Sequence, residues 1–279
     1  MILIADSGST KTSWRLIDSE NNLTQFKCVG LNPYIMDQNA IIEELRNTFT
    51  NVSTLEISQI YFYGSGCSTD SAKTKIREAL LEIFKKANAT VEGDMLGAAR
   101  AACGKEAGIA CILGTGSNSC FYDGAEIKEQ ISSSGFILGD EGSGVAMGKI
   151  LLGDFIRKEM PENLQNKLEK RFELNKDKIL ESVYRKERPN KYIAQFSKFI
   201  FQNLDQPYCQ NLVIRCFDEF FLKYICKYPE HKNHRIHFVG SIAFYFNSYL
   251  RKVARKHNIS IGNILEEPIA GLTLYHTSL

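Results

Sequence analysis

Residues 108–124 of the chain read GIACILGTGSNSCFYDG. The apolar run from Ile109 to Leu113 predicts a short buried strand, and a second strand is expected from Ser119 to the turn at Asp123 and Gly124. Between them, residues 114–118 predict a five-residue turn whose N–H groups can curl around an anion. Glycine-rich tips also occur in ordinary hairpins, so phosphate binding here is a hypothesis that needs a second signal.

The beginning of the chain repeats this pattern. Residues 2–5 predict a strand, residues 6–12 read DSGSTKT, and residues 13–18 predict the returning strand. Laid over the central stretch, residues 7–9 match residues 115–117. A repeat this short can arise by chance, but a supersecondary unit that occurs twice indicates a duplicated fold. Two such hairpins on two lobes can close on one polyphosphate from opposite sides.

Composition narrows the class of protein. The 279 residues, 44% hydrophobic and 24% charged, are typical of a globular protein with two domains. A net charge of +2 with interleaved acids and bases gives no electrostatic case for nucleic acid. No signal-peptide pattern or long apolar run is present, so we expect a cytoplasmic protein without a membrane span. Eight cysteines without a Cys-x-x-Cys pair favour reduced core thiols over disulfides, zinc or iron–sulfur sites.

The order of predicted elements indicates two α/β domains. Residues 1–107 follow the order β-β-β-α-β-α-β-α, which is typical of a mixed sheet with helices on its faces. Residues 108–279 begin in the same way, and three or four charged helices are inserted at about 161–228. A strand at 235–239, a helix to about 257, a strand at 259–264 and a closing helix at 268–276 complete this second domain.

Two acidic positions near the predicted strand ends can carry chemistry. Asp6 ends the first strand and can hold Mg²⁺ beside phosphate oxygens, or it can simply bond backbone N–H groups in a turn. A P-loop is excluded at Lys11 because Walker A requires glycines where Thr10 and Ala5 stand. Asp94 opens a helix of small residues and is either an N-cap or a general base that takes a proton from a hydroxyl attacking a γ-phosphoryl group.

A second acidic pair, Asp140 and Glu141, precedes another predicted helix in the sequence GDEGSG. Capping explains one acid. Two acids among the five glycines of residues 135–148 instead indicate a shaped loop, in which one acid is available to bind a polyol.

These motifs together resemble the N-acetylglucosamine kinase branch of the BadF/BadG/BcrA/BcrD ATPase family, within the actin/hexokinase/Hsp70 superfamily. The resemblance rests on DSGSTKT at 6–12, GDMLGA at 93–98, LGTGSNS at 113–119, GDEGSG at 139–144 and VGSIA at 239–243. It implies duplicated ribonuclease H-like (actin-like ATPase) domains, each a mixed five-stranded sheet with flanking helices, and an interdomain cleft. The implied activity is ATP- and Mg²⁺-dependent phosphorylation of an amino sugar, N-acetylglucosamine or a relative. A homodimer is left open.

The resemblance also implies roles for individual residues. Asp6 would serve Mg²⁺, and Asp94 would be the catalytic base. The nucleotide would contact Ser9, Thr10, Lys11, Thr12, Thr115, Gly116, Gly240 and Ser241. The sugar would contact Asn32, Ser117, Asn118, Ser134, Gly135 and Asp140. Ser134 stands where eukaryotic members carry a tryptophan, so the substrate can equally be glucosamine, N-acetylmuramate or another hexose derivative.

Three other functions compete with a sugar kinase. The family's other branch consists of ATPases that activate 2-hydroxyacyl-CoA dehydratases or benzoyl-CoA reductases through a [4Fe–4S] cluster between subunits, whereas the cysteines here fall mostly in predicted core elements. Sugar-sensing regulators of this fold need a DNA-binding segment before the first hairpin, and Asp6 leaves no room for one. A catalytically inactive sugar binder is disfavoured by the presence of Asp6, Asp94 and Asp140.

Overall fold

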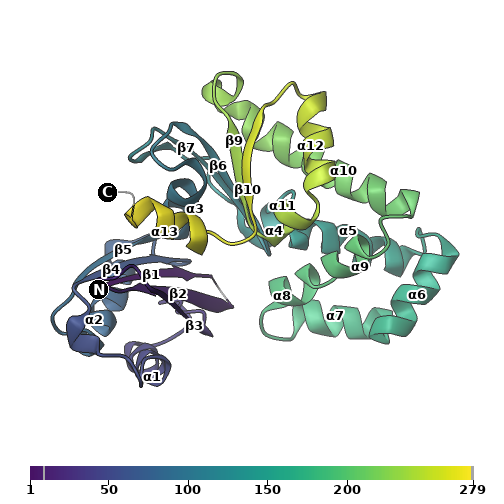
Figure 1. Cartoon of the computed structure of the whole chain (residues 1–279). Helices are drawn as coiled ribbons and strands as arrows, with labels where there is room; N and C mark the ends of the chain where they lie inside the picture. Colours follow the sequence, from purple (N-terminus) through teal and green to yellow (C-terminus); the bar gives the residue numbers. More distant parts are fainter. Residues whose placement is uncertain (9, 278–279) are drawn as a thin grey trace. The chain divides into compact units, whose positions relative to one another are not determined.

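The first of two compact units contains a mixed five-stranded sheet (Figure 1). The computed structural model describes residues 1–8 and 10–277. The sheet has the order β3-β2-β1-β4-β5, with β1 (Ile2–Ser7), β2 (Lys11–Ile17), β3 (Leu23–Val29), β4 (Gln59–Gly64) and β5 (Asn88–Gly93). The first three strands are antiparallel neighbours, whereas β4 and β5 run parallel to β1. The parallel strands require crossover connections, which helices provide.

Helices cover both faces of this sheet. They are α1 (Gln38–Thr48), the short 3₁₀ helix η1 (Thr54–Glu56), α2 (Asp70–Ile83), α3 (Asp94–Cys103) and α13 (Ile269–Thr277). Residues of α1 and α2 share a buried cluster with Trp14 and Phe62 on one face. On the other face, Leu272 of α13 packs with Ile4 and Tyr63, next to residues of α3. The first sheet is therefore buried on both sides.

The second unit repeats the strand topology of the first. Its sheet has the order β10-β9-β6-β7-β8, with β6 (Gly108–Leu113), β7 (Ser117–Tyr122), β8 (Ile127–Glu129), β9 (Ile236–Val239) and β10 (Ile261–Leu265). Strands β6, β7 and β8 are antiparallel, and β9 and β10 run parallel to β6. The predicted duplication of a mixed five-stranded sheet with flanking helices is confirmed.

The helices of the second unit are more numerous than expected. They are α4 (Gly135–Leu138), α5 (Gly144–Arg157), α6 (Glu162–Phe172), α7 (Lys176–Tyr184), α8 (Pro189–Ala194), α9 (Ser197–Phe201), α10 (Pro207–Lys223), η2 (Ile225–Lys227), η3 (Pro229–Lys232), α11 (Ser241–Tyr245) and α12 (Asn247–Lys256). The segment 161–228 holds five α-helices rather than three or four. The single helix predicted up to residue 257 is divided at Phe246, whose side chain is buried. No Gly or Pro marks this division in the sequence.

The closing helix belongs to the first unit rather than the second. The compact units comprise Met1–Lys105 with the described residues from Pro268 onward, and Glu106–Glu267. Helix α13 lies close against α3, since a Cβ atom on Gly271 would stand 2.2 Å from the carbonyl oxygen of Ala101. The predicted division placed all of residues 108–279 in one domain, so the two divisions differ at the C-terminal segment.

Two expectations from composition can be compared with the structure. All eight cysteines are free thiols, and six of them are buried. Within residues 1–8 and 10–277, none of the helices is long and apolar enough to cross a membrane.

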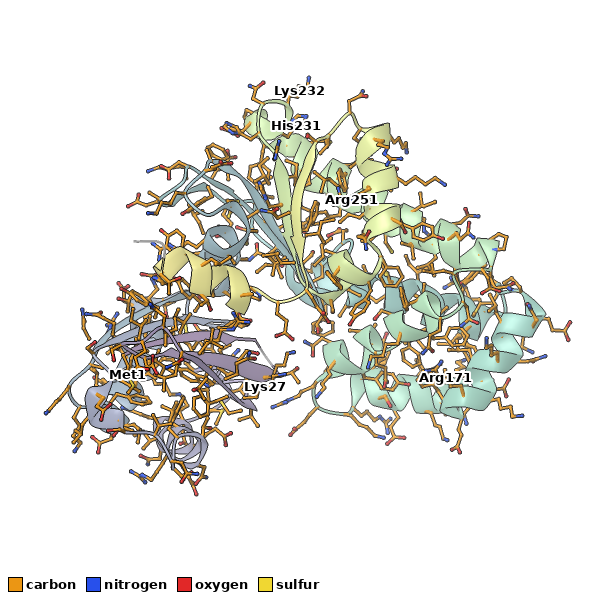
Figure 2. The ribbon with its side chains drawn as sticks, viewed as in Figure 1. Met1, Lys27, Arg171, His231, Lys232 and Arg251 are labelled. Atoms are coloured by element: carbon orange, nitrogen blue, oxygen red, sulfur yellow. The ribbon has the colours of Figure 1, made fainter. Side chains whose placement is uncertain are left out.

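The edge strand β3 carries the exposed Lys27, labelled in Figure 2, a charged residue that opposes edge-to-edge pairing with another chain.

A buried polar network joins α13 to the first sheet. The Tyr63 hydroxyl lies 2.8 Å from Nε2 of His276 and 2.8 Å from Nη1 of Arg100, which donates to it. The His276 ring stacks on Tyr61 with centroids 3.7 Å apart. Burial, together with the charge of Arg100, lowers the pKa of His276 to about 4 from an ordinary value of 6.5. His276 is therefore neutral in the folded protein at neutral pH.

We predict that stability falls as the pH is lowered from 6.5 towards 4. The unfolded chain protonates His276 near pH 6.5, whereas the folded chain does so only near pH 4, so the unfolded state binds more protons between these values. The free energy of unfolding should decrease by up to about 3 kcal/mol through this group. Urea unfolding across this pH range should show a steeper loss for the natural protein than for His276→Gln. Equal slopes would contradict the assignment.

Candidate functional site

The carboxyl ends of three parallel strands align the candidate catalytic residues of the first unit. Asp6 on β1 is in register with Tyr63 on β4, and Gly64 is in register with Gly93 on β5. Asp94 follows Gly93 directly. Neighbouring strands are about 4.8 Å apart, so Asp6 and the beginning of α3 are separated by about 10 Å along one sheet edge. In parallel α/β sheets this edge is where ligands bind.

Asp94 is the first residue of α3 and not its N-cap. The N-cap is Gly93, which has no side chain that could cap the helix. The residue as a whole is half-buried, and burial of its carboxyl group raises the pKa of that group above the ordinary 3.8, although the N–H groups of Met95 and of Asp94 itself act in the opposite direction. A carboxylate with a raised pKa accepts a proton more readily than an ordinary aspartate. Asp94 is therefore not the N-cap residue, but its carboxylate bonds N–H groups of the first helical turn, and its role as general base stays a prediction.

A close helix–strand contact fixes the position of α3. A Cβ atom on Gly97 would lie 2.8 Å from Cβ of Tyr63, and Tyr63 is only 1% exposed. Glycine at this position therefore lets α3 approach β4 more closely than any other residue would. Because Asp94 begins the same helix, this contact sets the distance of Asp94 from the sheet edge.

The first hairpin tip divides into exposed and buried residues. Thr10 and Lys11 are exposed, whereas Thr12 is fully buried. The Thr12 hydroxyl lies 2.8 Å from that of Ser7 and donates to the carbonyl of Val29 at 2.9 Å. Thr12 thus fastens the hairpin to the end of β3, and its predicted phosphate contact remains a prediction. The predicted nucleotide residue Ser9 lies outside the described residues.

Asn32 is held by residues that sequence analysis did not single out. Its Oδ1 accepts the N–H of Tyr34 at 2.9 Å, and a Cβ on Gly66 would stand 2.7 Å from this oxygen. Gly66 also has φ of +85°, which favours glycine. Lys75 donates to the carbonyl of Pro33 at 2.7 Å and so supports the same loop. The GSG tripeptide after β4 was the available signal for Gly66.

The turn between β6 and β7 is shorter than predicted. Leu113 pairs with Ser117 and Ile112 with Asn118, so the turn contains only residues 114–116. Ser117 and Asn118 belong to β7. The prediction of a five-residue turn was wrong, because the antiparallel pairing of β6 with β7 includes these two residues. The corresponding pair in the first hairpin is Ser7 and Thr12, which makes the second turn one residue shorter. No single alignment therefore superimposes both strands of the two hairpins.

Neighbouring segments enclose this turn within the second unit. The N–H groups of Gly144 and Val145, at the beginning of α5, donate to the carbonyls of Gly114 at 2.9 Å and Thr115 at 3.1 Å. Gly240 has φ of +119°, and a Cβ there would stand 2.4 Å from the carbonyl oxygen of Leu113. The structure thus brings Gly240, at the beginning of α11, next to the turn that carries Thr115 and Gly116. Ser241 is the first residue of α11 and is exposed.

Asp140 is the most distinctive group of the second unit. It is 7% exposed, and its Oδ1 accepts the N–H of Ser117 at 3.2 Å and the hydroxyl of Ser133 at 3.1 Å. Its Oδ2 would stand 2.8 Å from a Cβ on Gly116 and accepts no hydrogen bond from the described residues. A buried carboxylate with one oxygen held and one unused is suited to receive a ligand hydroxyl.

Other predicted sugar residues lie around Asp140. The Ser117 hydroxyl is buried and has no hydrogen-bond partner within the described part of the chain. The side-chain Oδ1 of Asn118 accepts the N–H of Ser119 at 2.9 Å and Nε2–H of Gln130 at 3.1 Å. Ser134 precedes the single-turn helix α4, and its Cβ would be 2.9 Å from a Cβ on Gly139. Gly135, with φ of +69°, begins that helix.

The described residues contain no cluster of three or more His, Cys, Asp or Glu side chains that could hold a metal ion. A magnesium–nucleotide complex needs no such cluster, because Mg²⁺ is commonly held by one or two carboxylates together with phosphate oxygens and waters. Asp6, at the sheet edge beside the first hairpin, is a carboxylate of this kind. Asp6 therefore has the chemistry and the place in the sheet that a Mg²⁺ ligand needs, and its metal role stays a prediction.

The duplicated sheets define an actin-like ATPase fold. Residues 5–207 match the model of the BadF/BadG/BcrA/BcrD ATPase family. The chain belongs to this family, and the resemblance noted from its motifs is confirmed.

Solved structures agree with this assignment. A protein from Porphyromonas gingivalis, provisionally described as an N-acetylglucosamine kinase, is 41% identical over 100% of this chain and 99% of its own, with a TM-score of 0.95. A protein from Chromobacterium violaceum with the same provisional description is 16% identical over 98% of each chain, with a TM-score of 0.74. A ROK-family glucokinase from Streptomyces griseus, in complex with glucose and AMPPNP, is 14% identical over 99% and 98%, with a TM-score of 0.59. The last two show likeness of fold alone. No protein with a curated description matched the chain.

We predict that Gly97→Ala lowers the melting temperature and that Gly153→Ala does not. Both changes gain about 1 kcal/mol in helix propensity. At Gly97 the added methyl group meets the buried Tyr63, and such overpacking costs about 1–3 kcal/mol. At Gly153, in α5, it meets only the end of the Arg157 side chain. Thermal unfolding of both variants checks this prediction. Equal changes in melting temperature would contradict the close contact between α3 and β4.

Proposed function

We propose that the chain transfers the γ-phosphoryl group of ATP to a hydroxyl group of an amino sugar, N-acetylglucosamine or a close relative. The observation that carries this proposal is the carboxyl of Asp94, with its raised pKa, on the same sheet edge as Asp6. The family is one of ATPases, and a relative 41% identical over its whole length is provisionally described as an N-acetylglucosamine kinase. Both findings support the same class of reaction.

In this proposal the donor is held mainly by backbone and hydroxyl groups. Asp6 would ligate Mg²⁺, which when bound would offset the negative charge of the β- and γ-phosphates. From the first hairpin, the exposed Thr10 and Lys11 would contact phosphate oxygens. Ser9 and Thr12 of the same hairpin would also contact the nucleotide. Thr115 and Gly116 would do so from the second hairpin. Gly240 and Ser241 would lie against the adenosine, consistent with the place of Gly240 beside the second turn.

The acceptor is held by polar groups whose hydrogen-bonding capacity is unused in the described residues. Oδ2 of Asp140 and the Ser117 hydroxyl would bond to sugar hydroxyls, and the Asn118 amide would add a donor. Asn32 would contribute from the loop that Lys75 supports, and Ser134 and Gly135 would line the sugar. Ser134 leaves more room than a tryptophan would. A sugar with a larger substituent than that of N-acetylglucosamine would therefore fit beside Ser134.

Asp94 would act as general base in the transfer step. Its carboxylate would accept the proton of the attacking sugar hydroxyl while that oxygen forms a bond to the γ-phosphorus. The bond between the γ-phosphorus and the β–γ bridging oxygen breaks, and ADP leaves with that electron pair. Exclusion of water from the reacting groups would favour transfer to the sugar over hydrolysis.

We predict that Asp94→Asn lowers sugar-dependent ADP release by about 10²- to 10⁴-fold, which is the usual contribution of a general base. ADP release should be measured with N-acetylglucosamine, glucosamine, N-acetylmuramate, glucose and N-acetylmannosamine. Asp37→Asn is a matched control. Asp37 caps α1 through the N–H of Ala40, and asparagine caps a helix equally well. ATP hydrolysis that is independent of every sugar and unchanged in Asp94→Asn would overturn the proposed function.

A further inference from the structure

The backbone around Asp140 is held in an uncommon conformation. Asp140 has φ of +61° and Gly142 has φ of +75°. The left-handed region is unfavourable for a residue with a Cβ, so Asp140 needs support from its surroundings to remain there. The contacts of Oδ1 with Ser117 and Ser133 supply part of that support.

The next residue, Glu141, connects this loop to α10. Its Oε1 lies 2.6 Å from Nζ of Lys223, and its Oε2 accepts the hydroxyl of Tyr224 at 3.0 Å. The Glu141 side chain is 13% exposed, and both oxygens are occupied by these contacts. Burial alone would raise the pKa of Glu141, but the bonds from Lys223, from the N–H of Glu141 itself and from Tyr224 lower it below its ordinary value. Glu141 is therefore a charged, fully engaged group and not a spare ligand for the sugar.

Aromatic contacts connect the same helix to both ends of the segment 139–142. A Cβ on Gly142 would lie 2.8 Å from Cβ of Phe220, and a Cβ on Gly139 would lie 3.3 Å from the hydroxyl of Tyr224. The Phe220 and Tyr224 rings stack with centroids 5.2 Å apart. Helix α10 thus contacts the loop before and after Asp140 as well as through Glu141. Lys149 of α5 adds a bond to the carbonyl of Gly139 at 3.2 Å.

We propose that Glu141, Lys223 and Tyr224 are positioning residues for sugar recognition, through which the helical insertion holds Asp140 in its binding conformation. This inference rests on the proposed function and assigns a role to α10 within it. Glu141 acts through Asp140 and does not contact the sugar. Loss of the connection lowers the affinity for the sugar and leaves nucleotide affinity and the chemical step unchanged.

The kinetic test uses Glu141→Gln, Lys223→Met and Tyr224→Phe in the full-length protein. Each variant should raise the KM for the sugar by about tenfold, the lower range for a lost charge-assisted hydrogen bond. The KM for ATP and kcat should stay within about twofold of the natural values, and the double variant of Glu141 and Lys223 should be no worse than the single ones, because both act through one contact. Equal increases in both KM values, or an unchanged KM for the sugar, would overturn the proposal.

Asp218→Asn is the matched control on the same helix. Asp218 forms an ion pair with Lys256 at 2.9 Å and lies 2.6 Å from Nε2 of His257. Lys256 is the last residue of α12 and His257 is its C-cap. The change removes a comparable charged contact of α10 without touching the loop, so the KM for the sugar should not change. If Asp218→Asn raised the KM for the sugar as much as Glu141→Gln does, the cause would be a general destabilisation of α10, and the proposal would be wrong.

Amide hydrogen exchange separates this inference from the proposed function. Segments covering residues 133–144 should exchange faster in Glu141→Gln than in the natural protein or in Asp218→Asn, with no sugar present. Faster exchange in a protein that phosphorylates none of the sugars would contradict the proposed function and support the connection to α10. Unchanged exchange would overturn the connection itself, whatever the activity.

Discussion

The parallel pairing of β1 with β4, and of β4 with β5, is the constraint on which the first unit depends. It brings Asp6 and Asp94, separated by most of the unit's sequence, to one sheet edge. The pairing alone does not place Asp94, because a helix can stand at different distances from its sheet. Gly97 removes that freedom by letting α3 contact Tyr63 directly. The positions of Asp6, the candidate metal ligand, and Asp94, the candidate base, thus follow from strand pairing and from the close contact at Gly97.

The second unit has the same sheet topology as the first, but other segments surround its hairpin. Its hairpin tip is enclosed by the beginning of α5 and by Gly240, both of which approach the backbone of residues 113–115. Asp140 is then held against β7 by Ser117 and, through Glu141, against α10. The helical insertion is therefore part of the architecture around the predicted sugar residues, and the duplicated sheets differ mainly in what is attached to them.

Much of the fold could be predicted from the sequence because its signals are local. Apolar runs bounded by Gly, Ser and Asp indicated strands in both sheets, and the order of predicted elements indicated two α/β units with helices on the sheet faces. Long-range contacts could not be predicted in this way. The length of the second turn depends on the pairing of Leu113 with Ser117, and the place of α13 depends on Gly271 meeting Ala101. The engagement of Glu141 by Lys223, 82 positions away, leaves no local trace in the sequence.

The proposed transfer of a phosphoryl group from ATP to a sugar is tested most directly by the fate of the γ-phosphorus. Phosphorus-31 NMR can follow this atom during incubation of the protein with ATP, Mg²⁺ and N-acetylglucosamine or one of its relatives. We expect ADP to appear together with a phosphate monoester signal that is coupled to sugar protons. Appearance of inorganic phosphate alone with every sugar, at an unchanged rate, would contradict it.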